Sequence, residues 1–171
     1  MNKLAATLAF VLLLALPLLA QQPASQEALL DQLVGKWVLQ GAIAGRQVTH
    51  DVDAEWVLKR GYVRLHEVSR ENDATGNPAY EAIIFINWDP RASEYLCLWL
   101  DSTANTGLTA DGIAHGKARG DEIPFVFKDT GGGGIRNTFK FMRTTNTWEW
   151  AIDNEEAGKL KPFARVTLKK K

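Results

Sequence analysis

The chain has 171 residues, a length that suits one ordinary domain and is short for two. Hydrophobic residues make up 46% of the sequence, which is typical of a globular protein, and 20 basic side chains balance 20 acidic ones. The only dense basic run is residues 169–171, at the end of the chain. Because nucleic-acid binding needs a basic surplus or a basic stripe, we expect no nucleic-acid partner.

The first twenty residues have the layout of a secretory signal peptide. Lys3 supplies the positive charge, residues 4–16 form the apolar stretch, and Pro17 ends that stretch shortly before the small residue Ala20. The apolar stretch is too short for a comfortable membrane span. Leu18 stands where a cleavage site prefers a small residue, so an uncleaved anchor is the alternative. We predict that residues 1–20 are cleaved, that the protein is periplasmic or secreted, and that no membrane span remains.

Residues 21–34 predict a short linker followed by a helix over residues 26–34, which Ser25 can cap and Gly35 ends. After Gly35 the apolar residues alternate with polar ones, and turn residues separate the alternating runs. The pattern predicts strands at residues 37–43, 48–58, 62–69, 80–88, 95–101, 108–119, 123–128, 135–143, 148–153 and 163–168. Closing these strands into a barrel would remove the exposed edges of an open sheet.

We therefore predict an all-β fold, a single antiparallel up-and-down barrel of about ten strands over residues 35–171. The short helix would cover one mouth of this barrel or lie against its wall. Alternation places His50 and Trp56 on the inward face of their strand. We assign Ala82 and Cys97 to the inward faces of theirs, with the reverse assignment as the alternative, because both faces of these strands are rather apolar. Cys97 is the only cysteine and is predicted to be a small buried hydrophobic residue.

Two short stretches carry a family resemblance. The motif Gly35-Lys36-Trp37 follows the predicted helix and opens the first strand, and a Trp99-x-Asp101-Ser102 stretch follows an Asp-Pro turn. Together they resemble lipocalin-like, calycin-type barrels, in particular a bacterial family of exported barrels whose function is unassigned. The resemblance implies a ten-stranded barrel in which Gly35 and Trp37 close one end under the helix. It implies no activity, because a fold does not determine a function.

No sequence motif indicates a cofactor, a metal or a catalytic nucleophile. Related barrels that bind haem use a histidine near the C-terminus, whereas the last histidine here is His115, which disfavours haem binding by that route. A turn at residues 60–61 would set His66 opposite Glu55 rather than near His50, so we predict no metal site from a histidine pair. We assign no catalytic residue and expect no cofactor.

The candidate ligand-binding residues are large aromatic side chains and polar side chains that we predict to face inward. Aromatic faces often line ligand cavities, although they also simply fill small barrels. An inward arginine would need an acidic partner, either in the protein or on the ligand. The set comprises Trp56, Arg64, Tyr80, Trp99, Asp101, Trp148, Trp150 and Arg165.

Asp101 has two interpretations: it could orient a ligand hydroxyl, or it could bond backbone N–H groups of the following loop. The first functional hypothesis is an exported binding protein that holds a small apolar or amphipathic ligand in the barrel. The alternative is a structural or interaction protein of the cell envelope with a filled barrel. A hydrolase or isomerase acting through Asp101 and a histidine ranks last, because no nucleophile–base pair is visible.

Overall fold

The structure, a computed structural model, describes residues 26–103, 108, 112–128 and 133–171. These residues form one helix and ten strands: α1 (Gln26–Asp31), β1 (Gly35–Ile43), β2 (Arg46–Val57), β3 (Tyr62–Ser69), β4 (Glu81–Asp89), β5 (Glu94–Asp101), β6 (Ile113–Gly116), β7 (Glu122–Lys128), β8 (Gly134–Met142), β9 (Thr147–Glu156) and β10 (Lys159–Lys170). Over this described part, no helix is long and apolar enough to cross a membrane. The predicted signal peptide and linker lie outside the described residues.

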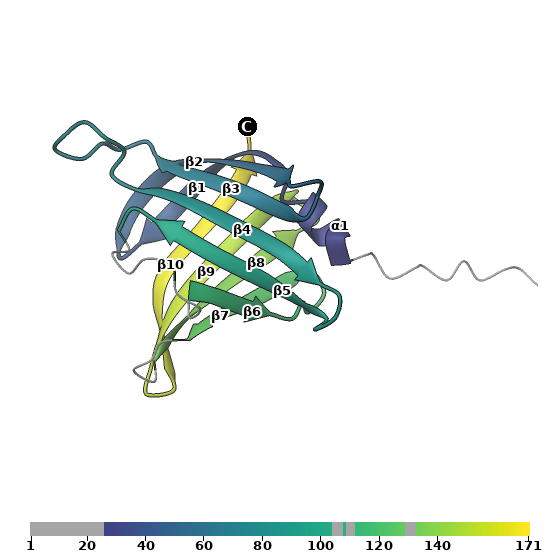
Figure 1. Cartoon of the computed structure of the whole chain (residues 1–171). Helices are drawn as coiled ribbons and strands as arrows, with labels where there is room; N and C mark the ends of the chain where they lie inside the picture. The colour runs from purple at the N-terminus through teal and green to yellow at the C-terminus, as the bar shows by residue number, and fades with distance from the viewer. Residues whose placement is uncertain (1–25, 104–107, 109–111, 129–132) are drawn as a thin grey trace, which may run out of the picture.

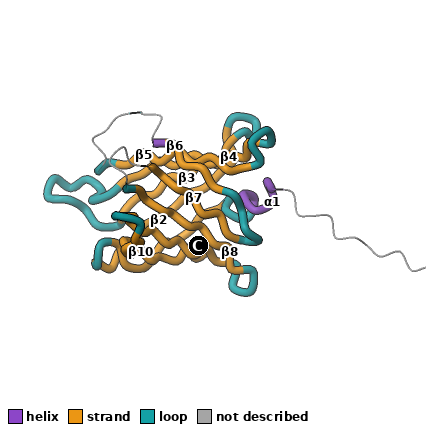
Figure 2. Tube along the Cα trace, turned by 90° about the horizontal axis from the view of Figure 1, so that it is seen from below, coloured by secondary structure: helices purple, strands orange, loops and turns teal. Residues whose placement is uncertain are grey.

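Each strand pairs antiparallel with the next one along the chain, and β1 pairs with β10, so the sheet closes on itself. Figure 1 shows the resulting barrel with α1 at one end and the long β3–β4 loop at the other. In the view of Figure 2, α1 again lies beside one end of the barrel. The predicted all-β barrel of ten antiparallel strands is confirmed.

The seam between β1 and β10 depends on a glycine. Gly41 lies opposite Val166, with a backbone φ of +151°. A β-carbon at Gly41 would lie 2.2 Å from the carbonyl oxygen of Arg165, well inside van der Waals contact. The absence of a side chain at position 41 therefore lets the first and last strands come close enough to close the barrel.

The interior face follows the predicted alternation. Ala82, Ile84 and Ile86 of β4 are at most 1% exposed, and so are Tyr95 and Cys97 of β5. Burial raises the pKa of the Cys97 thiol far above its usual value, so this cysteine stays protonated and acts as a core residue. Burial also raises the pKa of Tyr95, to about 12.

The helix end of the barrel is closed by apolar packing and by two indole groups. Leu29, Leu30 and Leu33 are buried over the mouth. Trp37 Nε1 donates to the carbonyl of Leu33 at 2.7 Å, and Trp148 Nε1 donates to the carbonyl of Gln32 at 3.1 Å. These bonds satisfy carbonyls that the end of a helix leaves without partners. The helix ends at Asp31, three residues earlier than predicted, and the carbonyls of the next two residues bond to the tryptophans instead.

The β2–β3 turn differs from the prediction. Leu58, Lys59 and Arg60 all have positive φ angles, of 50°, 58° and 65°. This longer turn changes the register, so His66 lies opposite Asp53 and not opposite Glu55 as expected. The turn brings Arg60 to Asp31 of α1 at 2.6 Å, with its guanidinium 4.5 Å from the centre of the Trp56 ring.

Candidate functional site

A buried, hydrogen-bonded pair of side chains lies inside the barrel, toward the end away from α1. Nδ1 of His50 on β2 is 2.6 Å from Oε1 of Glu67 on β3, and the two residues are 3% and 2% exposed. Both occupy inward positions of their strands, and the register pairs His50 with Ser69 and Val52 with Glu67. The two polar side chains are therefore diagonal neighbours on the inner face, which brings them within hydrogen-bonding distance.

Tyr80 extends this polar pair toward the next wall. Its ring stacks on His50, with the ring centres 5.5 Å apart. Its hydroxyl accepts a hydrogen bond of 3.1 Å from Nε1 of Trp99 on β5. Burial, helped by the negative charges of Glu67 and Asp101, raises the pKa of Tyr80 far above its usual value. The hydroxyl therefore keeps its proton and can donate as well as accept.

Trp99 connects this group to the opposite wall. Its ring meets Trp150 of β9 edge-on, with ring centres 6.1 Å apart, and Trp150 packs against Phe139 of β8 at 4.4 Å. Asn137 pairs with Ile152, two positions along from the Phe139–Trp150 pair, so Asn137 and Trp150 are diagonal neighbours on the inner face.

We call this connected set the interior polar belt. It crosses the barrel from β2 and β3 to β8, and each member touches or neighbours the next. Its members are Glu67, His50, Tyr80, Trp99, Trp150 and Asn137.

The belt carries buried polar atoms that lack partners. Among the described residues, four buried side-chain atoms have no hydrogen-bond partner. Two belong to the guanidinium groups of Arg64 and Arg136. The other two are Nε1 of Trp150 and Oδ1 of Asn137, and both of these residues are 2% exposed. Each such atom costs about 1–3 kcal/mol unless something bonds to it, so a donor and an acceptor of the inner face call for a bound group.

The structure brings three of the predicted site residues together: Tyr80, Trp99 and Trp150 all belong to the belt. Asp101 lies on β5 just beyond Trp99 and takes the structural role that was one of its two interpretations. Its Oδ1 accepts from the backbone N of Thr103 at 2.8 Å and from the Thr103 hydroxyl at 2.6 Å.

The two arginines among the candidates do not face inward, and that expectation was wrong. Arg64 alternates with the buried residues of β3, its side chain is 37% exposed, and it pairs with Glu55 at 2.5 Å. Arg165 is 49% exposed and pairs with Asp153 at 2.5 Å. A charged guanidinium is more stable against an outer-wall carboxylate than inside the barrel, where its desolvation would be costly.

Trp56 and Trp148 lie at the other end of the barrel, against the helix. Trp56 Nε1 donates to Asp31 Oδ1 at 2.7 Å, and Trp148 donates to the carbonyl of Gln32. Their indole groups hold the cap in place. The tryptophans thus divide into a set that closes the helix end and a pair, Trp99 and Trp150, in the belt.

Sequence reasoning missed Glu67 and Asn137 as site residues. Each shares the inward face of its strand with a large apolar residue two positions away, Glu67 with Leu65 and Asn137 with Phe139. A polar residue in an apolar inward row was the available signal. His50 was correctly placed on the inward face, but its partner came from a register that only the folded turn sets.

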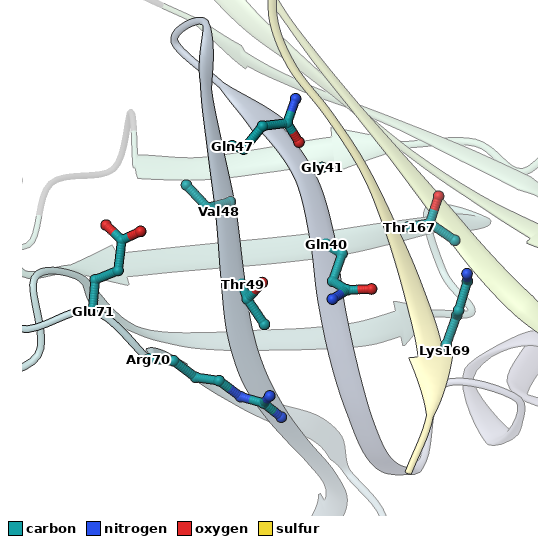
Figure 3. A pocket seen from close by; sticks show the side chains of 9 residues that line it. All are labelled: Gln40, Gly41, Gln47, Val48, Thr49, Arg70, Glu71, Thr167 and Lys169. Atoms are coloured by element: carbon teal, nitrogen blue, oxygen red, sulfur yellow. The ribbon is translucent and has the colours of Figure 1, made fainter.

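A separate groove of about 500 Å³ lies on the outer wall. Figure 3 shows its side chains, which come from β1, β2, β10 and the start of the β3–β4 loop. Gln40, Thr49 and Thr167 alternate with buried residues of their strands, so the groove lies outside the barrel. The lining residues are Gln40, Gly41, Gln47, Val48, Thr49, Arg70, Glu71, Thr167 and Lys169.

Within the described ranges, no group of three or more histidine, cysteine or acidic side chains could hold a metal ion. No known protein-family model matches this chain, and no curated protein matches its sequence.

Proposed function

We propose that this chain is an exported, lipocalin-like binding protein that holds a small amphipathic molecule inside the barrel, at the mouth away from α1. The observation that carries the proposal is the pair of buried atoms without partners, Trp150 Nε1 and Asn137 Oδ1. They lie beside the aromatic side chains of Trp99 and Phe139, so polar and apolar surfaces meet at one place. Amphipathic ligands need this combination.

Apolar surface near the mouth away from α1 supports the same location. The side chains that pack on the core there are only partly buried, so a ligand entering at this mouth could cover them: Ile43, Val48, Tyr80, Trp99 and Phe127. Val34, Trp56 and Trp88 at the helix end are partly buried as well, but α1 lies over that end and Trp56 bonds to it.

Native mass spectrometry of the gently purified, exported protein tests whether the barrel holds a molecule. We expect a mass above that of the denatured chain, with the excess released on denaturation. Equal masses, together with no uptake of the neutral apolar dye Nile red, would overturn the proposal and favour a filled barrel that acts through a protein partner.

A pair of tryptophan variants tests the location. Trp99→Ala should abolish Nile red binding, because Trp99 connects the belt across the mouth. The control Trp88→Ala removes the same residue type at the helix end, where Trp88 packs on Tyr95. Its binding should persist, provided that the melting curve shows a folded protein. Loss of binding in the control alone would place the ligand at the other end.

N-terminal sequencing of the exported protein tests the localisation. We expect the mature chain to begin at Gln21, after the predicted signal peptide. A chain that is retained in the cell and still begins at Met1 would overturn the export proposal.

A further inference from the structure

The polar groups inside the barrel indicate which ligand head group would bind there. This inference rests on the proposed binding function. Among the described residues, His50 and Glu67 are the buried histidine and acidic side chains, and no lysine or arginine is buried. Arg64 and Arg165 lie on the outer wall with acidic partners. An anionic head would therefore meet no buried arginine or lysine in the described part of the interior, and the one buried imidazole found there already bonds to Glu67.

Asp101 adds to this unfavourable setting for anions. It lies at the mouth end of β5, two residues beyond Trp99, and its negative charge, like that of Glu67, raises the pKa of Tyr80. A carboxylate that loses its water shell there gains no charge-assisted hydrogen bond in return, and moving an unpaired ion out of water is costly.

The two inner-face atoms without partners indicate which groups a matching ligand head must carry. Nε1 of Trp150 can only donate, so the ligand must supply an acceptor. Oδ1 of Asn137 can only accept, so the ligand must supply a donor. The two side chains are diagonal neighbours on the inner face, so one ligand head can approach both of them. An ammonium group has donors but no acceptor and would satisfy only Asn137.

We propose that the barrel selects an uncharged head group that carries a donor and an acceptor together, a primary amide or a hydroxyl, and discriminates against free carboxylic acids. The apolar part of the ligand packs against Trp99 and Phe139. The neighbouring Tyr80 hydroxyl and the imidazole of His50, on which the Tyr80 ring stacks, complete the polar surface.

A matched series of ten-carbon probes tests this selectivity: decanamide, decan-1-ol, decanoate and decylammonium. Titration of the full chain at about pH 7.5, where a fatty acid is ionised, gives each dissociation constant. We expect decanamide and decan-1-ol to bind at least tenfold more tightly than decanoate or decylammonium. Decanoate binding as tightly as decanamide would overturn the head-group selectivity alone. Binding of none of the four would overturn the proposed function itself.

Asn137→Leu tests the assigned acceptor. The change should weaken decanamide binding about tenfold, the factor that one hydrogen bond commonly provides, and leave decanoate binding unchanged. Thr138→Val is the matched control, because Thr138 is the next residue on β8 and faces the outer wall. Equal effects of the two variants, or an unchanged ratio of decanamide to decanoate affinity in Asn137→Leu, would overturn the assignment.

Discussion

His50 Nδ1 and Glu67 Oε1 lie 2.6 Å apart inside the barrel, and each residue is almost completely shielded from water. Replacing Glu67 by Leu would leave the buried imidazole without its partner. We expect the free energy of unfolding to fall by about 2–3 kcal/mol in urea denaturation. Glu55→Leu, which breaks the exposed pair with Arg64, should cost less than about 1 kcal/mol. Similar costs for the two variants would contradict the energetic role of the buried pair.

Oδ1 of Asn137, which has no partner in the described part of the chain, leads to the opposite prediction: removing it should stabilise the protein. Asn137→Leu removes a buried acceptor that has no partner among the described residues and adds an apolar side chain of similar size. The ligand-free protein should become more stable by about 1–2 kcal/mol, because no desolvation cost remains. Thermal unfolding of Asn137→Leu and of the outer-wall control Thr138→Val would measure this gain. A destabilised Asn137→Leu would mean that Oδ1 is already satisfied in the free protein.

The stability of the barrel should depend more on Gly41, at the seam between β1 and β10, than on a glycine in a turn. Gly41→Ala would drive a β-carbon into the Arg165 carbonyl at a φ of +151°, so we expect a loss of about 3 kcal/mol or more. Gly45→Ala is the matched control, since Gly45 also has a positive φ, of +77°, but nothing lies within 4 Å of the added carbon. It should cost about 1 kcal/mol. Comparable denaturation midpoints would argue against close packing at the seam.

The contribution to stability of each hydrogen bond from an indole group to the end of α1 should be measurable separately. Trp37→Phe and Trp148→Phe each leave a carbonyl of residues 32–33 without its donor. Each should lower the free energy of unfolding by about 1–3 kcal/mol. Hydrogen exchange in α1 should become faster at the same time. Trp88→Phe, a half-buried residue at the same end, should have a smaller effect on α1 exchange, and equal effects in all three would exclude a specific role for the bonds.

The ion pairs of Asp51 should make the stability of the protein depend on pH in the acidic range. Hydrogen bonds from Arg70 and Lys171 lower the pKa of this carboxyl to about 2. Because the folded value lies below the unfolded value of about 3.9, the stabilisation is present above that unfolded value. It is lost as the pH falls through the folded value. The side chain is 41% exposed, so solvent screening keeps the effect small.

Urea denaturation between about pH 5 and pH 2 would measure this contribution. The stability difference between the native chain and Asp51→Asn should shrink as the pH falls through that window. A difference that is constant across the window would rule out the ion pairs with Arg70 and Lys171 as its source.

Several features of this protein are determined locally and could be predicted from the sequence. Strand alternation has a period of two, so it identified the inward rows that contain His50, Ala82 and Cys97, and it predicted the ten strands in order. Trp37 of the Gly35-Lys36-Trp37 motif lies at the end of the barrel that the helix covers, where it bonds to Leu33. The same local pattern could have identified Glu67 and Asn137 as polar residues in apolar rows.

Only the tertiary structure decided which of these side chains meet. The turn at Leu58, Lys59 and Arg60 set the β2–β3 register. In this register His66 lies opposite Asp53 and not opposite Glu55. Closure of the sheet brought Trp99 of β5 against Trp150 of β9, a contact between strands far apart in the chain. Alternation says which way a side chain points along its own strand, but contacts across a barrel depend on the accumulated registers of every strand between them.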